Sequence, residues 1–391
     1  AAGGKIASIT LPEYRQTIKK DSDAIHTISP SENNQALGTY FSNPELAELS
    51  KAEYVLSDKG PTKVFSAQRG TVSIRKEYSR GTTPFSLTST ITIESKDSKK
   101  DLGYLMIPVG GNNLVHDINV PIQSWEVVWD QNDKVSRVTV DSIEANEVHQ
   151  GNTRWLAFGN RYFATTIVNK SETNPDVVVG SEGVFKGGYF RFPIRLKEGK
   201  NSATYQIDIY SGPKITEQLE SVPGMKALID YGMFSSLAFY LLKMLQFFYH
   251  YVHNYGVAMI ILTIAVRLAL YPLSLKSYRS MKAMQKLTPQ IQTLKEKYKD
   301  DVKRQQQEQM ALFKAHGVNP MGGCLPMLVQ LPVFVALYAV LGNSIELFHA
   351  PFFGWVHDLS TKDPFYVYPV LMGVAMLIQQ KMTPSVGMDP V

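Results

Sequence analysis

The chain is predicted to combine an antiparallel β-sandwich with an α-helical transmembrane core that carries a basic helical hairpin. Three observations support this fold class. Short segments of β-forming residues recur up to residue 213, apolar stretches of membrane-spanning length follow Phe234, and a strongly basic segment separates two of these stretches. The average composition hides the division, because 391 residues with 44% hydrophobic content and a formal net charge of +5 resemble an ordinary soluble protein.

Residues 1–213 are predicted to form the β-sandwich. Several segments alternate apolar and polar residues, which is the pattern of half-buried strands, and their regular spacing is typical of an antiparallel sandwich. Residues 31–60 are rich in loop-forming residues, and no repeat of fixed period is present. The predicted strands lie within 71–78, 85–95, 124–130, 134–143, 161–168, 187–196 and 202–210.

The only cysteine is Cys324, so the β-sandwich has no thiol and its core must suffice without disulfides. The chain begins with Ala1-Ala2-Gly3-Gly4 and shows no signal segment, although the predicted topology requires an export route for the β-sandwich. We therefore expect an N-terminal signal or anchor to precede residue 1.

The β-sandwich contains no pattern that supports catalysis. No set of His, Cys, Asp and Glu has metal-ligand spacing, and neither a phosphate-binding glycine loop nor a nucleophile elbow occurs. Trp125, Trp129 and Trp155 could line a carbohydrate-binding cleft, but tryptophan in a sandwich packs more often in the core. We expect core positions for them, with no cofactor, no metal and no small-molecule substrate.

Residues 214–254 are predicted to connect the two parts. The segment 216–222 is predicted to be helical and to end at Pro223-Gly224. In 234–253, polar side chains recur three and four residues apart among Leu, Phe and Met, which predicts an amphipathic helix at the membrane interface. A transmembrane span is the alternative, but Lys243 would then lie at mid-bilayer. His250 and His253 are expected to be a polar edge of this helix and not a metal site.

Three spans are predicted, at 255–275, 323–345 and 365–382, and the last is at the short limit. Arg267 lies near the middle of the first span, and none of the three contains Asp or Glu. A cation at that depth is costly unless it lines a wet cavity or meets an anion. The sequence therefore predicts a polar groove inside the membrane.

The segment 276–320 contains ten Lys and Arg residues against four Asp and Glu, whereas the loop 346–364 has an acidic balance. The positive-inside rule places the basic segment in the cytoplasm and the β-sandwich outside. The same rule puts the loop 346–364 on the outer side and the tail 383–391 in the cytoplasm.

The basic segment is itself predicted to be a helical hairpin. Thr288-Pro289 can restart a helix, and Asp300-Asp301 can cap a returning helix that ends near Gly317. Its apolar residues are expected to form the inner face, with adaptable contacts to apolar partners as the alternative. Its basic faces could meet anionic lipid or ribosomal RNA, or remain solvated. The apolar series is Met281, Met284, Leu287, Ile291, Leu294 and Tyr298.

Several motifs resemble those of the YidC membrane-protein insertases of Gram-negative bacteria, which belong to the wider YidC/Oxa/Alb family. The motifs are TIAVRLALYPLS around Arg267, the segment VNPMGGCLPMLVQLPVFVALY, and the aromatic loop FHAPFFGWVHDLS. The similarity covers nearly the whole chain from Gly3 and is most specific in 255–390. It implies a supersandwich-like periplasmic domain and a multi-pass location in the cell inner membrane.

The resemblance implies an insertase and chaperone, not an enzyme, that inserts and helps fold inner-membrane proteins alone or with the Sec translocon. Its partners would be nascent membrane proteins, the Sec translocon, the ribosome and the lipid bilayer. The client-binding groove would contain Arg267, Thr263 and Gln330, with the arginine attracting polar or acidic tails. An apolar slide would contain Cys324, Leu328, Leu331, Pro332 and Phe334, for which packing against lipid or helices is the alternative role. The cytoplasmic hairpin would use Met281, Met284, Lys286, Lys295, Asp300 and Arg304.

The chain departs from the family pattern at its ends, because a family member has an N-terminal anchor and two more spans after the segment that ends here at Val391. We therefore expect the chain to be a portion of a longer protein. Two other classes stay open. A transporter or channel would pair the arginine with intramembrane acids or repeat its helices, and a cell-envelope carbohydrate-active enzyme or binding protein would use a cleft in the β-sandwich.

Overall fold

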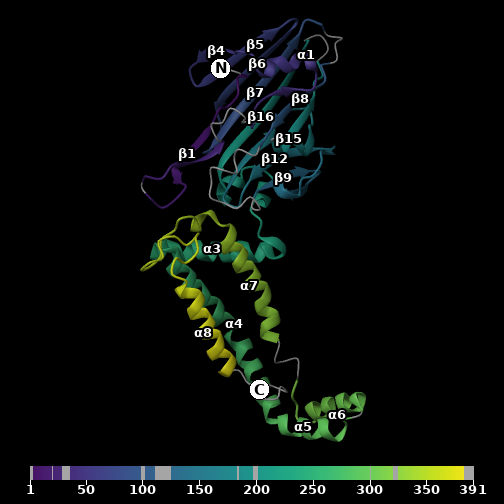
Figure 1. Cartoon of the computed structure of the whole chain (residues 1–391), viewed down its shortest axis with the longest axis vertical. Coiled ribbons are helices and arrows are strands. Elements are labelled where there is room, and N and C mark those ends of the chain that lie inside the picture. Colours follow the sequence, from purple (N-terminus) through teal and green to yellow (C-terminus); the bar gives the residue numbers. More distant parts are fainter. Residues whose placement is uncertain are drawn as a thin grey trace. The chain divides into compact units, whose positions relative to one another are not determined.

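The computed structural model describes residues 3–19, 21–28, 36–97, 102–110, 125–182, 185–196, 201–299, 301–319 and 325–382. The chain divides into two compact units. The first contains Ala1–Asp230 with Asn343–Ile345, and the second contains Tyr231–Gly342 with Glu346–Val391. Strands build the first unit and helices build the second (Figure 1), as the predicted fold class requires.

The strands of the first unit are β1 (Ile9–Arg15), β2 (Ala24–Ile28), β3 (Tyr40–Phe41), β4 (Val55–Lys59), β5 (Thr62–Arg69), β6 (Val72–Arg80), β7 (Ser86–Ser95), β8 (Tyr104–Pro108), β9 (Glu126–Gln131), β10 (Lys134–Thr139), β11 (Glu147–His149), β12 (Thr153–Gly159), β13 (Phe163–Asn169), β14 (Asp176–Glu182), β15 (Phe185–Pro193) and β16 (Ser202–Pro213). A nine-stranded sheet has the order β10-β9-β12-β13-β16-β7-β6-β5-β4, and a five-stranded sheet has the order β11-β14-β15-β8-β3. β1 and β2 form a separate pair, and the strand pairs of the described residues are antiparallel.

The neighbouring strands β7 and β16 show how alternation builds the core. Their register places Ile91 opposite Tyr205 and Ile93 opposite Ala203, and all four side chains are buried. The residues between them along β7 are only half-buried or exposed. The alternation predicted within 85–95 is therefore confirmed as one buried and one more accessible face.

The two larger sheets pack face to face, since β12 contacts both β14 and β15. Gly188 of β15 permits this close approach, because a Cβ there would lie 2.8 Å from Cγ1 of Val127 and 3.1 Å from Cδ1 of Leu156. Trp125 stacks on Phe158 with ring centroids 5.2 Å apart. The predicted β-sandwich is thus confirmed, with its core between the two sheets.

Several strands are missing from the sequence prediction. β12 is buried along nearly its whole length, so it lacks the alternation by which half-buried strands are recognised. Residues 31–60, predicted to be loop-rich, contain short elements within their described part. These are β3, β4, the helix α1 (Pro44–Ala47) and the 3-10 turn η1 (Glu48–Ser50).

The first unit continues to Asp230, beyond the boundary expected at residue 213. The helix predicted over 216–222 is only α2 (Thr216–Leu219), and the 3-10 turn η5 (Met225–Leu228) follows it. Apolar side chains of this connector are buried, which is the physical reason that it belongs to the unit. They are Leu219, Met225, Leu228 and Ile229.

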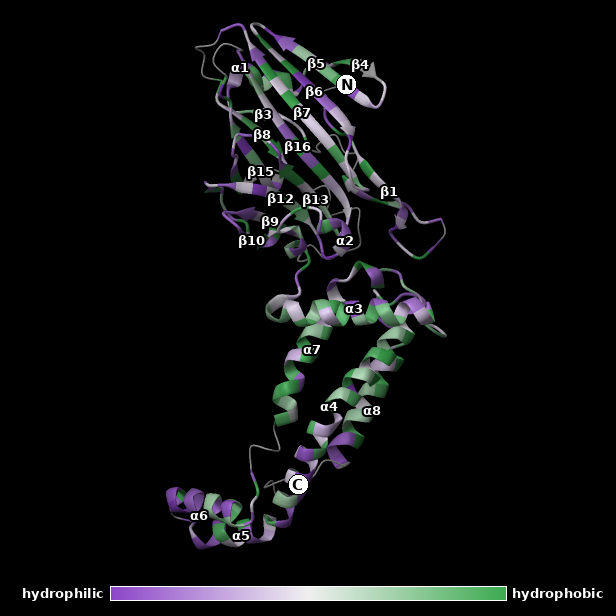
Figure 2. Ribbon diagram, turned by 180° about the vertical axis from the view of Figure 1, so that it is seen from behind, coloured by the Kyte–Doolittle hydropathy of each residue, from purple (hydrophilic) through white to green (hydrophobic). Residues whose placement is uncertain are grey.

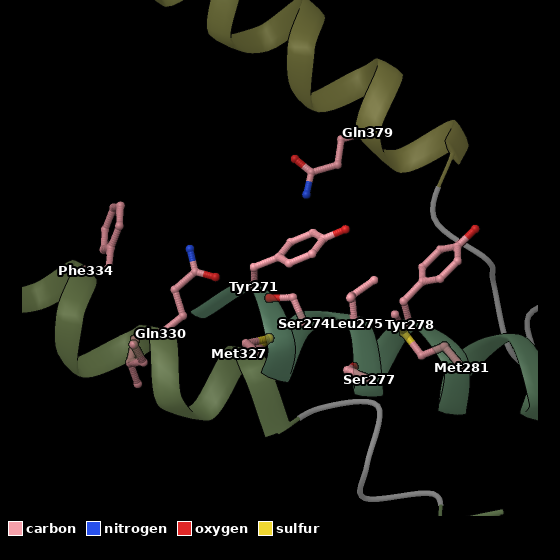
Figure 3. A pocket seen from close by; sticks show the side chains of 11 residues that line it. Tyr271, Ser274, Leu275, Ser277, Tyr278, Met281, Met327, Gln330, Phe334 and Gln379 are labelled. Atoms are coloured by element: carbon pink, nitrogen blue, oxygen red, sulfur yellow. The ribbon is translucent and has the colours of Figure 1, made fainter. Parts of the chain in front are cut away.

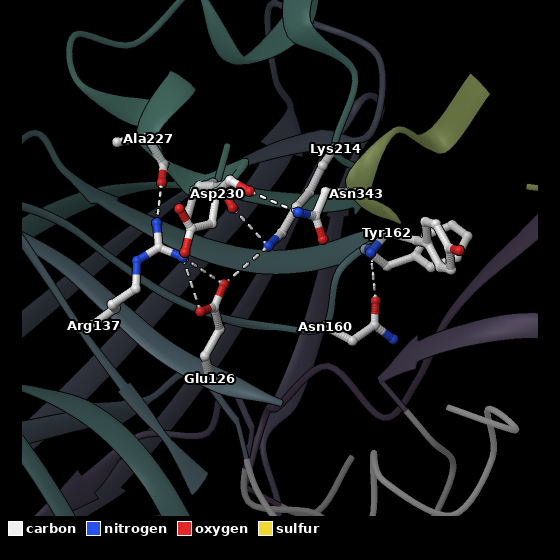
Figure 4. A network of polar contacts seen from close by, with 10 residues as sticks. Glu126, Arg137, Asn160, Tyr162, Lys214, Ala227, Asp230 and Asn343 are labelled. Carbon is white, nitrogen blue, oxygen red and sulfur yellow. Dashed lines mark hydrogen bonds and ion pairs between the residues drawn. The ribbon is translucent and has the colours of Figure 1, made fainter. Parts of the chain in front are cut away.

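Lys214, the first residue after β16, holds the connector in place. Its Nζ donates to the backbone oxygen of Leu228 at 2.8 Å and lies 3.3 Å from Oε1 of Glu126. Arg137 lies 3.0 Å from the same carboxylate and 3.3 Å from that of Asp230 (Figure 4). Burial lowers the pKa of Lys214, and the charge of Glu126 opposes that shift.

The second unit is built from α3 (Ser235–Val252), α4 (Tyr255–Lys286), α5 (Thr288–Lys297), α6 (Val302–Ala315), α7 (Leu325–Asn343) and α8 (Val367–Met382). α3 packs on α4, and α5 packs on α6. Hydrophobic residues dominate α3, α7 and α8, whereas α5 and α6 are largely hydrophilic (Figure 2). Among the described residues, α4 is the one helix long and apolar enough to cross a membrane, and α7 supplies a shorter apolar helix from Met327. Membrane crossing by α7 and α8 stays a prediction.

α3 has the two faces that the sequence predicts for residues 234–253. Its buried face is apolar, and its exposed face includes Tyr240, Lys243 and Phe247. The Nζ of Lys243 lies 4.6 Å from the ring centroid of Phe239. This cation–π contact keeps the ammonium beside an aromatic ring without burying it. The location of α3 at the membrane interface stays a prediction.

α4 runs across the predicted boundary between the first span and the hairpin. The helix does not stop at residue 275 but continues to Lys286, because the change from apolar to basic side chains at 276 contains no helix-breaking residue. α5 then starts at Thr288-Pro289 as predicted, and Asp301 caps α6 by accepting a 3.0 Å hydrogen bond from the backbone N–H of Arg304.

Candidate functional site

Polar side chains form a stripe along one face of α4. They follow one another at intervals of four, four, three and four residues, which aligns them on a helix, and all are exposed. The hydroxyl of Thr263 donates to the backbone oxygen of Met259 at 2.8 Å, and that of Ser274 donates to Leu270 at 3.1 Å. We call this set the polar stripe; it consists of Thr263, Arg267, Tyr271, Ser274 and Tyr278.

Arg267 is the one charged member of the polar stripe. Its neighbours Ile264 and Leu268 are 53% and 67% exposed, so the guanidinium stands on an accessible apolar surface. Within the described ranges Arg267 forms no ion pair. A cation in such a position attracts any anion that comes within a few ångströms, because apolar surroundings screen charge weakly.

A cavity of about 660 Å³ lies where the polar stripe faces α7 and α8 (Figure 3). In Figure 3 the side chains of Tyr271, Gln330 and Gln379 point toward this space. Its polar lining also includes Ser274 and Tyr278, and no charged side chain contributes to its lining among the described residues. The cavity can therefore hydrogen-bond a polar chain without imposing a charge preference. The apolar lining includes Met281, Met327, Leu331 and Phe334.

α7 presents an apolar face that is accessible over its whole described length. Leu328, Leu331 and Phe334 are 57%, 57% and 63% exposed. Sequence reasoning missed two further members, Met327 and Tyr338, both 74% exposed and in step with Leu331 and Phe334. The helical interval of three and four residues could have identified them.

The structure brings together part of the predicted site. Gln330, Leu331 and Phe334 line the cavity. Arg267 and Thr263 lie on the polar stripe of α4 and do not line the cavity, and Leu328 of α7 does not line it either. Pro332 lies inside α7 and is half-buried. Cys324 lies outside the described residues.

The predicted hairpin residues that the structure describes divide into three groups. Met281 lines the cavity, while Met284 packs against a small core of Leu287, Ile291 and Phe313. Lys286, Lys295 and Arg304 are exposed, and the guanidinium of Arg304 lies 5.4 Å from the ring centroid of Tyr298. Asp300 lies outside the described residues, and its neighbour Asp301 caps α6.

The three tryptophans of the β-sandwich and its metal-ligating residue types are candidates for a second site. Trp125, Trp129 and Trp155 are at most 6% exposed, so they belong to the core, as predicted, and do not line an open cleft. The described part of the chain contains no group of three His, Cys, Asp or Glu side chains arranged to hold a metal.

Two family models match the chain and together cover nearly all of it. The model described as the YidC periplasmic domain matches residues 1–244, and the model described as 60Kd inner membrane protein matches residues 247–391. The boundary between the matches lies within α3.

Curated relatives have the name membrane protein insertase YidC. The chain is 47% identical to the one from Geotalea daltonii over 66% of this chain and 48% of that protein. It is 46% identical to the one from Geotalea uraniireducens over 66% of this chain and 49% of that protein. It is 49% identical to the one from Oleidesulfovibrio alaskensis over 52% of this chain and 40% of that protein. The chain thus spans about half the length of the curated relatives it matches.

Among solved structures, a galactose mutarotase-like protein from Lactobacillus casei aligns with 54% of this chain and 94% of its own chain. The TM-score is 0.32 and the sequence identity is 11%. A likeness of this size supports no conclusion about ligand or activity.

Proposed function

Because the chain belongs to the family of YidC membrane-protein insertases, we propose that it draws the polar tail of a client membrane protein along the polar stripe while the apolar part of the client meets α7. The client class is a nascent inner-membrane protein with a short hydrophilic tail. In this role the protein is not an enzyme, since no covalent bond of the client changes. The relatives' name, membrane protein insertase, describes such a non-enzymatic role.

The observation that supports this proposal most strongly is the position of Arg267. Its side chain is exposed on the apolar part of α4, and Tyr271, one turn further along the same face, lines the cavity. A polar tail that enters the cavity is therefore one helical turn from a cation. At an effective dielectric constant of about 20, an ion pair at about 4 Å gains about 4 kcal/mol, and desolvation of both groups offsets part of this gain.

The neutral cavity and the apolar face of α7 have complementary roles. Tyr, Ser and Gln side chains can replace water around the backbone of an extended tail, which lowers the cost of moving that tail away from water. The exposed Leu328, Leu331 and Phe334 offer an apolar surface to the hydrophobic segment of the same client. A client with both features meets both surfaces together.

We also propose a cellular location and partners for the protein. The match to an inner-membrane protein family supports a multi-pass location in the cell inner membrane, with the β-sandwich in the periplasm. The exposed cations of α5 and α6, among them Lys295 and Arg304, complement ribosomal RNA or anionic lipid. Cooperation with the Sec translocon follows from the family alone.

The proposal is tested by insertion of matched clients that differ only in the charge of the translocated tail. Full-length protein with Arg267→Ala or Arg267→Glu should insert an acidic-tailed client less well than a neutral-tailed one, as measured by protease protection. Arg267→Lys should retain most insertion because the charge persists. Equal defects for both tails would refute charge capture.

Arg279→Ala provides a matched control, since Arg279 is an exposed arginine on the same helix beyond the apolar part. It should leave the difference between acidic and neutral tails unchanged. The abundance of each variant in the membrane is compared first, so that a folding defect is separated from an insertion defect.

A further inference from the structure

The loop between α7 and α8 has an unusual distribution of polar and aromatic groups. Five of its aromatic side chains are exposed. Phe353 is 62% exposed, Phe365 is 69% exposed and Tyr366 is 56% exposed. Trp355 and Tyr368 are 37% and 43% exposed. Large apolar side chains that gather on a surface in this way mark a contact with another apolar phase.

The acids of the same loop are directed to internal hydrogen bonds. Asp358 is 8% exposed, and its Oδ2 lies 2.7 Å from Nδ1 of His349. Its Oδ1 accepts from the backbone N–H of Ser360 at 2.8 Å and from the hydroxyl of Ser360 at 2.6 Å. Burial alone would raise the pKa of Asp358, but the hydrogen bonds from His349 and Ser360 outweigh burial and lower it. We call His349, Asp358 and Ser360 the clasp.

A second carboxylate organises the other half of the loop. Asp363 accepts from Nε1 of Trp355 at 3.1 Å and from the backbone N–H of Phe365 at 3.0 Å through one oxygen. Its other oxygen accepts from the backbone N–H of Tyr368 at 2.9 Å. The indole of Trp355 also stacks on Tyr368, with centroids 5.7 Å apart. The polar atom of the exposed indole is thus satisfied within the loop.

The loop is joined to the first turn of α4. Gly256 lies against Phe352, and a Cβ at this glycine would collide with the ring. Glu346 accepts a 2.9 Å hydrogen bond from Nε2 of Gln246 in α3. The loop therefore packs beside the N-terminal end of α4, and its aromatic surface continues into the exposed Val370 and Leu371 of α8.

We propose that this aromatic loop, residues 347–368, inserts into the headgroup–acyl boundary of the bilayer, and that the clasp holds it in the inserting conformation. The occupant is a phospholipid bilayer, because the aromatic surface is continuous with the apolar faces of α4 and α8 and because Trp and Tyr favour this boundary. Both carboxylates of the loop accept internal hydrogen bonds while five aromatic side chains are exposed, and such a concentration of exposed rings is unusual on a surface that faces water. The inference depends on the proposed membrane setting but not on insertion of clients.

Trp355 is a built-in reporter, because the other three tryptophans of the chain are buried in the β-sandwich. Full-length protein is reconstituted into vesicles of phosphatidylcholine and phosphatidylglycerol whose acyl chains are brominated either near the headgroup or near the chain end. We expect bromine near the headgroup to quench the tryptophan fluorescence more strongly than bromine near the chain end. Trp355→Phe should abolish the quenching by brominated lipid.

The role of the clasp is tested with two histidines of one loop. His349→Gln should red-shift the emission of Trp355 and reduce its quenching by lipid. His357→Gln should leave both unchanged, since His357 is exposed and lies outside the clasp. Unchanged emission from the buried tryptophans shows that the β-sandwich remains folded.

Two outcomes would overturn the inference. If aqueous iodide quenches Trp355 fully and brominated lipid does not, the loop faces water. If neither quencher reaches Trp355, a protein covers the loop. Because the assay contains no client, failure of this inference leaves the insertion proposal untouched, and loss of insertion in Arg267 variants does not affect quenching.

Discussion

The ammonium of Lys76 donates a hydrogen bond of 2.5 Å to the backbone oxygen of Gly3, deep inside the β-sandwich. The same Nζ lies 4.5 Å from the ring centroid of Tyr54, and Lys76 is 0% exposed. Gly3 also donates its N–H to the oxygen of Ala52 at 2.8 Å. One lysine on β6 thus fixes Gly3 against the large sheet.

Replacing Lys76 with methionine should change how stability depends on pH. Burial lowers the pKa of Lys76 from 10.5 to about 7. Between these values the unfolded chain binds the proton more tightly than the folded protein, so wild-type stability rises with pH from about 7 upward and is flat below. The penalty at pH 7 is on the order of a few kcal/mol.

Lys76→Met should remove this slope while leaving the carbonyl of Gly3 without its donor. The variant should therefore be more stable than wild type near pH 7 and lose that advantage progressively as pH rises toward 10.5. Urea unfolding at a series of pH values measures the difference. Parallel pH profiles for the two proteins would show that Lys76 keeps an ordinary pKa.

Gly224→Ala should destabilise the connector strongly. Gly224 has φ +83°, and a Cβ there would lie 2.9 Å from Oδ2 of Asp130 and 3.4 Å from Nε1 of Trp155. Strain and collision together should cost about 2–4 kcal/mol. Gly70→Ala is the control, because Gly70 has φ +58° but open space around its Cβ, so only the strain of about 1 kcal/mol applies. Similar losses of Tm in both variants would contradict the collision.

A fragment of residues 1–230 should fold more stably than a fragment of residues 1–213. The shorter fragment lacks Lys214 and the buried apolar side chains of the connector, which would expose apolar surface of the sandwich. Thermal unfolding followed by near-ultraviolet circular dichroism should give a lower Tm and a broader transition for the shorter one. Identical transitions would place the functional boundary of the domain at Pro213.

Single cysteines at Lys299 and Lys362, in a Cys324-free background, should be labelled from opposite sides of the membrane by an impermeant thiol reagent. Lys299 follows α5 in the basic hairpin, and Lys362 is exposed in the loop before α8, outside the clasp. The excess of basic residues in 276–320 sets the side of the hairpin. Labelling of both positions from one side would mean that the number of crossings between them is even.

Sequence patterns predict most of the fold where a residue's environment repeats along the chain. Alternation finds β7, and the Thr288-Pro289 and Asp301 signals find the hairpin. β12 is not predicted, because a strand buried on both faces has no alternation of apolar and polar residues. Hydropathy changes at 276 while helix propensity does not, so the sequence separates an apolar part and a basic part that one helix, α4, contains.

The candidate site is predictable to a smaller extent. Arg267 is recognisable in the sequence because a charge within an apolar span is costly. Gln330 is recognisable for a similar reason, since it is a polar residue within the predicted span 323–345. Tyr271 and Tyr278 do not stand out, because tyrosine is common at membrane boundaries and only the alignment of α4 with α7 makes them cavity residues. Gln379 comes from α8, distant in sequence, and no local pattern connects it to Tyr271.

The unbroken course of α4 limits how this chain can change length. Each residue inserted or deleted in a helix rotates everything beyond it by about 100°. A single deletion between Arg267 and Tyr278 would therefore turn the arginine away from the face that continues into the cavity, while leaving every side chain chemically intact. A gain or loss of residues is tolerated far more easily in the loops of the β-sandwich, so over evolutionary time α4 should vary in the identity of its side chains and not in their number.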